Sequence, residues 1–173
     1  MRETTPGPER EMLEVVDERD QVIGSATRAE IHANRWMHRA VHIFVFNSHG
    51  QVYVQRRSAF KDRFPGVLDS SAAGHVDPGE GYEETAAREL REELGINAHI
   101  EEVLRVTASE ITDYEHVVLY RAVTGETPEP NPDEIQWGSH MAPEHLTLLM
   151  EQNPNDFVPA FIFLWKEYLR LKK

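Results

Sequence analysis

Three glutamates, Glu89, Glu92 and Glu93, are spaced so that their side chains meet on one side of a helix. The segment 82–94 has the apolar periodicity of a helix, and Gly95 is a suitable residue to end it. At about 100° per residue, the three carboxylates fall within a narrow arc. The residues that would pack on a sheet lie on a neighbouring face: Ala86, Ala87, Leu90 and Leu94. The spacing predicts an acidic stripe beside an apolar one.

Like charges at this spacing repel one another and destabilise an isolated helix by roughly 0.2–0.5 kcal/mol per pair. A hard divalent cation such as Mg²⁺, which binds carboxylate and phosphate oxygens, would remove that repulsion. Gly74, Gly79 and Gly81 allow tight turns before the helix, where a backbone carbonyl can add a ligand. A solvated acidic face is the more common explanation of such a stripe, so the spacing alone does not establish a metal site.

The segment 74–96 resembles the Nudix box, in which a glycine is followed after five residues by a glutamate. After seven more residues comes the run Arg-Glu-apolar-x-Glu-Glu-x-Gly-apolar. Every fixed position is matched, by Gly74, Glu80, Arg88, Glu89, Leu90, Glu92, Glu93, Gly95 and Ile96. The resemblance implies an α/β fold, the Nudix-type α/β/α sandwich, in which helices flank a mixed β-sheet. It also implies a pyrophosphohydrolase that cleaves a phosphoanhydride bond in a nucleoside diphosphate-type or other diphosphate substrate.

The same resemblance implies roles for residues of the box. The ligands of Mg²⁺, for which Mn²⁺ can substitute, would be the Gly74 carbonyl and the carboxylates of Glu89, Glu92 and Glu93. Arg88 and Glu80 would form an ion pair that orients the site, so that Glu80, Arg88 and Glu89 make up the catalytic set. A metal ion there would neutralise the charge that develops when water attacks phosphorus.

The flanks resemble the isopentenyl-diphosphate isomerases and their Nudix relatives over about residues 13–96. The matching segments are 16–18, 22–24, 38–41, 44–47, 55–58 with Lys61, 64–66 and 74–75. In this resemblance Arg57 and Lys61 would bind the substrate diphosphate, and a solvated basic loop is the alternative. The resemblance further implies an additional metal site with the ligands His32, His38, His75, Asp113 and Glu115. An accidental cluster is the alternative here, because the chain holds 9 histidines.

The residue at position 73 separates the two activities. The isomerases move protons on carbon with a cysteine just before the Gly-His pair, whereas this chain has Ala73 there and no cysteine at all. The isomerases also have a degenerate Nudix box, while this one is intact. We therefore expect hydrolysis, with an isomerase-like protein and a non-catalytic nucleotide-binding module as the alternatives.

Acidic residues after the box offer a further metal ligand or a general base, as Nudix enzymes often use one from a late loop. Asp133 and the adjacent Glu134 are candidates, and Glu110 and Glu115 stay open beside them.

The remaining pattern predicts a mixed sheet with helices at the end of the chain. We expect hairpins over 11–25 and 41–54, strands over 100–108 and 116–123, a proline-rich loop over 127–133, and helices over 143–150 and 157–171. A flexible N-terminal tail over 1–10 would precede a single domain over 11–173.

Composition limits the partners. Lys and Arg number 18 and Asp and Glu 30, which gives 18 − 30 = −12 at pH 7. Such a surface repels nucleic-acid backbones and anionic membranes and favours cations. The chain has no cysteine for disulfides or thiolate metal sites, and we see no secretory signal or membrane span. We expect a cytoplasmic protein with a small-molecule diphosphate substrate, and a homodimer is an open alternative.

Overall fold

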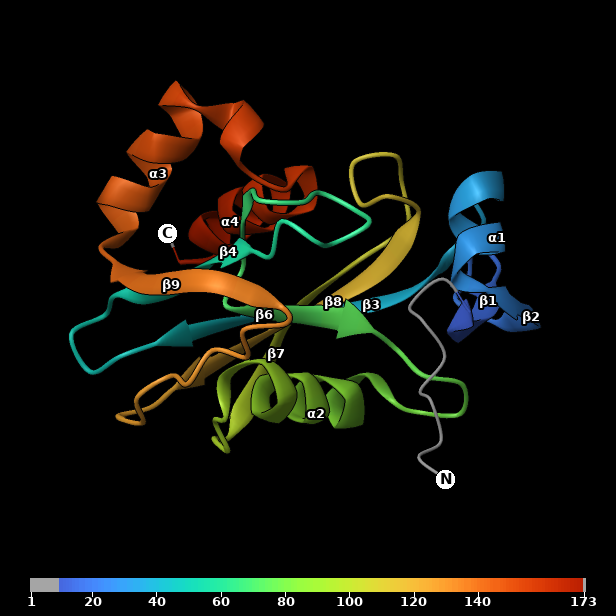
Figure 1. Cartoon of the computed structure of the whole chain (residues 1–173), viewed down its shortest axis with the longest axis horizontal. Coiled ribbons are helices and arrows are strands. Elements are labelled where there is room, and N and C mark those ends of the chain that lie inside the picture. The colour runs from blue at the N-terminus through green and yellow to red at the C-terminus, as the bar shows by residue number, and fades with distance from the viewer. Residues whose placement is uncertain (1–9, 173) are drawn as a thin grey trace.

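The centre of the structure, a computed structural model that describes residues 10–172, is a seven-stranded mixed β-sheet (Figure 1). The strands are β1 Met12–Val16, β2 Val22–Thr27, β3 His38–Phe46, β4 Val52–Arg57, β5 Leu68–Asp69, β6 Ala72–His75, β7 Ile100–Val106, β8 Glu115–Val123 and β9 Ile135–Met141. The helices are α1 Arg28–Asn34, α2 Tyr82–Leu94, α3 Pro143–Gln152 and α4 Pro159–Leu171, with a 3₁₀ turn at Pro154–Asp156. The predicted tail over 1–10 lies outside the described residues except for Arg10.

Strand β3 organises the sheet. It runs parallel to β8 along its whole length, from the His38–Glu115 pair to the Phe46–Val123 pair, and antiparallel to β6. Strand β4 meets β3 only at the Phe46–Val52 pair and then pairs with β5 and β9. The hairpin predicted over 41–54 is therefore wrong beyond its tip. The turn forms, but β3 takes β6 and β8 as its neighbours.

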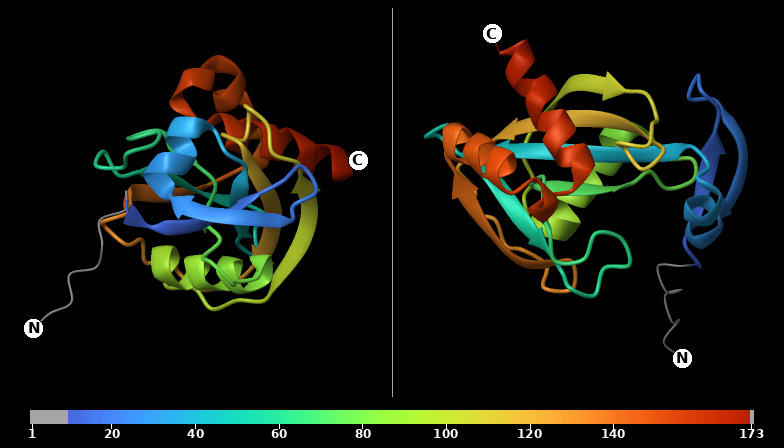
Figure 2. Two further views of the ribbon diagram at one scale, coloured as in Figure 1. Left: turned by 90° about the vertical axis from the view of Figure 1, so that its right-hand side faces the viewer. Right: turned by 90° about the horizontal axis from the view of Figure 1, so that it is seen from above.

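The two faces of β3 are both buried, which accounts for its almost continuous apolar run. Val41 and Ile43 pack with Leu90 of α2 on one face. Phe44 packs on the other face, with ring centroids 5.7 Å from Phe161 and 5.5 Å from Trp165 of α4. Figures 1 and 2 show α2 on one side of the sheet and α3 and α4 on the other. The α/β/α sandwich with a mixed sheet is confirmed.

Several elements match the sequence pattern closely. Helix α2 has the predicted bounds, and Gly95 ends it with a φ of 66°. Strands β7 and β8 and helices α3 and α4 lie within about two residues of the predicted ranges. The hairpin over 11–25 is confirmed as β1 and β2, which pair antiparallel.

Four elements, α1, β5, β6 and β9, were not predicted from the sequence. Strands β5 and β6 are two and four residues long, too short for a periodic signal. Helix α1 spans seven residues, although Thr27 and Glu30 form a capping box, a recognisable start signal. Among the described residues, no helix is long and apolar enough to cross a membrane.

The β1–β2 hairpin is held against the start of α2 by a charged network. Asp20 accepts hydrogen bonds from Arg39 Nε at 2.6 Å and from the Tyr82 hydroxyl at 2.9 Å. Glu14 accepts one from the Gly79 amide at 3.1 Å. These contacts place Glu11, just before β1, beside His75 at the end of β6.

Candidate active site

A cavity of about 780 Å³ opens beside β6 and collects most of the predicted site residues. Those that line it are His32, Arg57, Lys61, Gly74, His75, Arg88, Glu89, Glu92, Glu93, Asp113 and Glu115. Glu80 and His38 lie behind this lining, in contact with Arg88 and His75 respectively. The fold thus brings two predicted groups, one from α2 and one from the histidines, to a single cavity.

Gly74 lets a carboxylate rest directly on the backbone of β6. A Cβ at this position would lie 2.2 Å from the Glu89 carboxyl carbon, closer than any real Cβ contact. Only glycine therefore permits the observed position of the Glu89 side chain. The close approach also leaves the backbone at Gly74 beside that carboxylate, as a metal site using both would require.

Glu89 and Glu93 form a buried pair of like charges. Burial, together with the neighbouring Glu93, raises the pKa of Glu89 to about 8, while burial raises the pKa of Glu93 to about 7. Glu93 accepts hydrogen bonds from Gln55 Nε2 at 2.7 Å and from the Ala73 amide at 3.4 Å. Two oxygen ligands held this close and dry fit a hard divalent cation.

Glu92 occupies a different environment from the other two carboxylates. Its side chain is 59 % exposed, and it lies 3.3 Å from Arg88 Nη1, one turn away. The acidic stripe predicted from the helical arc is therefore split into two buried ligand positions and one solvent-facing carboxylate. The division arises because β6 covers only one side of the stripe.

Arg88 and Glu80 form the predicted ion pair. Arg88 Nε and Nη2 each donate to one Glu80 carboxylate oxygen at 2.9 Å, a bidentate geometry, and Nη1 donates to Glu89 at 2.7 Å. The hydrogen bonds from Arg88 lower the pKa of Glu80 to about 2. Arg88 therefore links the loop before α2 to the buried carboxylates.

Arg57 is bound by acceptors of its own chain. It donates to Asp69 at 2.9 Å and to the Arg63 and Phe64 carbonyls at 3.1 Å each. These contacts fix the 58–66 loop, and the binding of a diphosphate by Arg57 stays a prediction.

Lys61 points into the cavity and forms an ion pair with Glu134 from the late loop. Burial lowers the pKa of Lys61, against the attraction of Glu93 and Glu89. An ammonium group thus lies between the late loop and the buried carboxylates. Asp133 lines the cavity as well, whereas Glu110 is not part of the lining.

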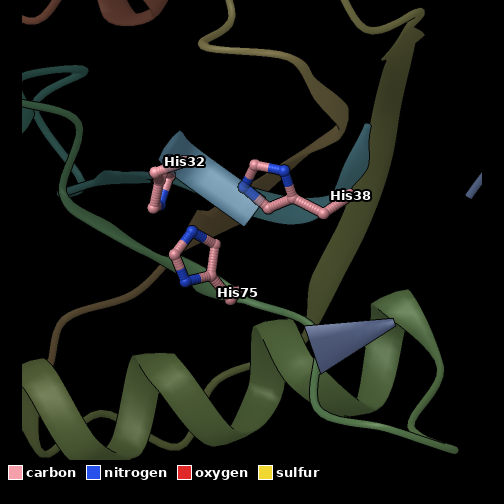
Figure 3. Close-up of side chains that lie close together, drawn as sticks. All are labelled: His32, His38 and His75. Carbon is pink, nitrogen blue, oxygen red and sulfur yellow. The ribbon is translucent and has the colours of Figure 1, made fainter. Parts of the chain in front are cut away.

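Three histidines converge on the other side of β6 (Figure 3). The ring centroids of His32, His38 and His75 lie 5.1–5.6 Å apart, and one nitrogen from each lies within 4.8 Å of the others. Glu115 Oε1 is 3.2 Å from His75 Nε2 and 3.5 Å from His38 Nε2. Asp113 is 3.5 Å from His32 Nδ1, and Arg63 Nε also donates to it at 3.0 Å.

The electrostatics of this cluster are uneven. Burial alone would lower the pKa of His75, but the carboxylates of Glu11, 3.9 Å from Nδ1, and Glu115, hydrogen-bonded to Nε2, raise it to about 9. Burial and the two neighbouring imidazoles lower the pKa of His32 to about 4. The Nε2 atoms of His32 and His38 are buried without a hydrogen-bond partner in the described chain. A metal ion bound between these imidazole nitrogens would supply the partner that they lack.

Several residues at the cavity were missed from sequence. Gln55 and Asp69 are buried polar groups that hold Glu93 and Arg57. Gln55 lies in the isomerase-like segment 55–58 but was given no role there, and Asp69 belongs to no motif. Glu11 lies at the edge of a hairpin, with no sequence sign that it reaches His75. His42 did leave a signal, because it is the one polar residue in the run 40–46.

Comparison with known proteins agrees with this geometry. Residues 36–161 match the model of the Nudix domain family. A protein named Nudix hydrolase from Deinococcus radiodurans is 38 % identical over 144 residues, 81 % of this chain and 84 % of the relative. An isopentenyl-diphosphate Delta-isomerase from Serratia proteamaculans is 30 % identical, over 91 % of this chain and 90 % of the relative. The crystal structure of DR0079 from Deinococcus radiodurans superimposes with a TM-score of 0.79 at 34 % identity, over 92 % of this chain and 98 % of that one.

Replacing Gly74 tests the contact with Glu89. Gly74→Ala should weaken the binding of Mn²⁺ to the free protein by about 10- to 100-fold, because the methyl group displaces the Glu89 carboxylate. Thermal stability should change little, since only the end of a flexible side chain has to move. Gly81→Ala is the matched control, with nothing within 4 Å of its new Cβ. Equal Mn²⁺ affinity in the two variants would show that the contact between Gly74 and Glu89 does not position a metal ligand.

The buried protons predict a pH dependence. Glu89 and His75 have pKa values of about 8 and 9 in the folded chain, against ordinary values of 4.5 and 6.5. Near neutral pH the folded chain therefore holds protons on both groups that the unfolded chain releases. The metal-free protein should therefore lose stability as the pH rises from 7 to 9. His32, with its pKa of about 4, acts in the opposite direction only below about pH 6.5.

Urea unfolding at several pH values without metal measures this slope, and Glu89→Gln should flatten it because an amide does not titrate. Stability that rises between pH 7 and 9 would contradict the assignment.

Proposed function

Since the chain belongs to the Nudix family, we propose that it is a Mg²⁺-dependent hydrolase of a phosphoanhydride bond, acting on a nucleoside diphosphate-type substrate. The observation that carries the proposal is the pair formed by Glu93, which is buried, and Glu89, whose side chain is 13 % exposed and lies against the backbone of Gly74. Two carboxylates in so dry a place repel each other unless they share a proton or a cation. In the metal-free protein a proton on Glu89 removes this repulsion, and a bound divalent cation would take its place.

The carbonyl of Gly74 and the carboxylates of Glu89, Glu92 and Glu93 are the proposed metal ligands. Among them Glu92, being exposed, can move most freely toward a metal–substrate complex. When bound, the cation would neutralise charge on the phosphate oxygens and promote attack by water. Arg88, held by Glu80, keeps the Glu89 carboxylate in place.

Cationic side chains beside these carboxylates would bind the substrate's diphosphate. Lys61 is the better placed of the two predicted groups, because its ammonium group lies within the cavity and a single carboxylate, Glu134, pairs with it. Phosphate oxygens can replace that partner, which would leave Glu134 free. Glu134 is therefore our candidate for the late-loop ligand or general base. Arg57 supports this arrangement by holding the loop that carries Lys61.

The isomerase alternative is disfavoured by the chemistry at position 73. Ala73 lines the cavity with a methyl group, which can neither take a proton from carbon nor return one. A non-catalytic nucleotide-binding module would have no need of buried carboxylates whose like charges repel each other. The resemblance to the isomerases is more relevant to the metal site expected at the three histidines than to the reaction catalysed.

We also propose that His32, His38 and His75 hold a second divalent metal ion. The unpartnered Nε2 atoms of His32 and His38 support this, and so does the neighbouring Glu115 carboxylate. Asp113 can serve as a further ligand only by loosening its ion pair with Arg63.

Hydrolysis is tested on a panel of nucleoside di- and triphosphates, dinucleoside polyphosphates and ADP-sugars with Mg²⁺. Release of phosphate or a monophosphate is the readout, and isopentenyl diphosphate should give no dimethylallyl diphosphate. Glu93→Gln should lower kcat by about 10²–10⁴-fold on whichever substrate is turned over. Glu84→Gln, an exposed glutamate of the same helix, is the control and should keep wild-type activity.

Two results would refute the proposal. One is wild-type turnover by Glu93→Gln, and the other is isomerisation by the cysteine-free protein.

The histidine site is tested by its spectrum as well as its metal content. Co²⁺ added to the metal-free protein should give visible absorption bands of a histidine-ligated ion, and His38→Gln should abolish them. His49→Gln, in an exposed turn, should leave the bands intact. If His38→Gln retains the full spectrum, the three histidines are not the ligands.

A further inference from the structure

His42 is a buried side chain at the cavity to which the proposed chemistry gives no role. It lies on β3, is only 4 % exposed, and pairs in register with Ala73 of β6. We call the surface around it the inner wall. The inner wall consists of Ala40, His42, Ala73, Val158 and Ala160, all of which line the cavity. Apart from His42, its side chains are small and apolar.

A short hydrogen-bond chain sets the tautomer of His42. Nδ1 lies 2.6 Å from the Ser70 hydroxyl oxygen, and that hydroxyl lies 3.2 Å from Asp69 Oδ1. Asp69, paired with Arg57 at 2.9 Å, accepts hydrogen bonds only, so the hydroxyl proton points toward it. The hydroxyl oxygen then accepts from Nδ1–H of His42. Both short contacts are satisfied only in this arrangement.

This tautomer leaves Nε2 without a proton, as a hydrogen-bond acceptor. Nδ1 occupies the side of the ring toward Ser70, so Nε2 lies on the side that lines the cavity. Among the described residues, none donates a hydrogen bond to it. Nε2 is not among the buried unpartnered atoms, so solvent in the cavity reaches it. A ligand that fills the cavity displaces that solvent, and the acceptor then loses a hydrogen bond unless the ligand donates one.

The inner wall lies close to both proposed binding groups. Asp69 joins His42, through Ser70, to Arg57 at the base of the Lys61 loop. On the other side, the amide of Ala73, the register partner of His42, donates to Glu93. A diphosphate held between Lys61 and the cation proposed at Glu93 would therefore place its organic group within reach of the inner wall.

We propose that His42 is a specificity-determining residue whose Nε2 accepts a hydrogen bond from an N–H or O–H group on the organic part of the substrate. The substrate class is then the diphosphates of nucleosides and sugars. Isoprenoid diphosphates have no such donor and would leave Nε2 buried and unpaired. This inference rests on the proposed hydrolase function, and it limits the substrates to diphosphates whose organic group is polar.

The matched variant is His42→Asn. The asparagine amide can keep the hydrogen bond to Ser70, in the place of Nδ1, but it is too short to replace Nε2. The probes are the preferred nucleoside diphosphate and isopentenyl diphosphate, which share a diphosphate head group and differ in the organic part. The wild-type protein should favour the nucleotide.

His42→Asn should lower kcat/KM on the nucleotide by about 10- to 100-fold, mainly through KM, and change kcat/KM on isopentenyl diphosphate less than about twofold. ¹⁵N NMR of the metal-free protein should show Nδ1 of His42 protonated and Nε2 bare. Ser70→Ala should remove that preference between tautomers.

An equal loss of kcat/KM on both probes would overturn the proposal, because it would assign His42 a purely structural role. A protonated Nε2 together with an unprotonated Nδ1 would overturn it as well.

If the wild-type protein hydrolyses neither probe, the hydrolase proposal fails. Calorimetric binding of the same two probes, with Ca²⁺ present, to wild type and His42→Asn then decides the His42 proposal separately. A wild-type preference for the nucleotide that His42→Asn abolishes supports it, and unchanged binding refutes it.

Discussion

The site depends on the burial of two like charges, Glu89 and Glu93, against the edge strand β6. Burial raises the pKa of both carboxylates, and the charge of Glu93 raises the pKa of Glu89 further. Three surrounding residues position this pair or offset its charge. Gly74 removes the side chain that would push Glu89 away, Gln55 orients Glu93, and Lys61 brings a positive charge near both. The site is therefore strained by charge until a cation or protons compensate it.

The central strand β3 determines which chemistry reaches which side of the cavity. Successive side chains of β6, its antiparallel partner, point to opposite faces of the sheet. Gly74 faces α2 and its carboxylates, whereas Ala73 and His75 face the side that holds the other histidines and the start of α4. One four-residue strand thus separates an oxygen-rich site from a nitrogen-rich one, while a single cavity connects them.

Relatives named as hydrolases and relatives named as isomerases are both similar in sequence to this chain over most of its length, which indicates one shared backbone frame. Differences in chemistry on such a frame come down to individual side chains at the cavity surface. Ala73 offers no group that exchanges a proton with carbon, and His42 adds a hydrogen-bond acceptor to an otherwise apolar wall. Neither side chain alters the backbone pairing around it, so a change of chemistry need not disturb the fold.

The resemblance of the segment 74–96 to the Nudix box predicted the Arg88–Glu80 pair and the sandwich architecture. The sequence alone predicted helix α2 and its end at Gly95, because helical periodicity and capping act over a few residues. It could not determine that Glu92 faces solvent while Glu93 is buried, since the helical arc places both on one side and only the packing of β6 separates them. Likewise, Arg57 is held by Asp69 and two loop carbonyls. Contacts between residues far apart in the chain arise from tertiary packing, and no local pattern encodes them.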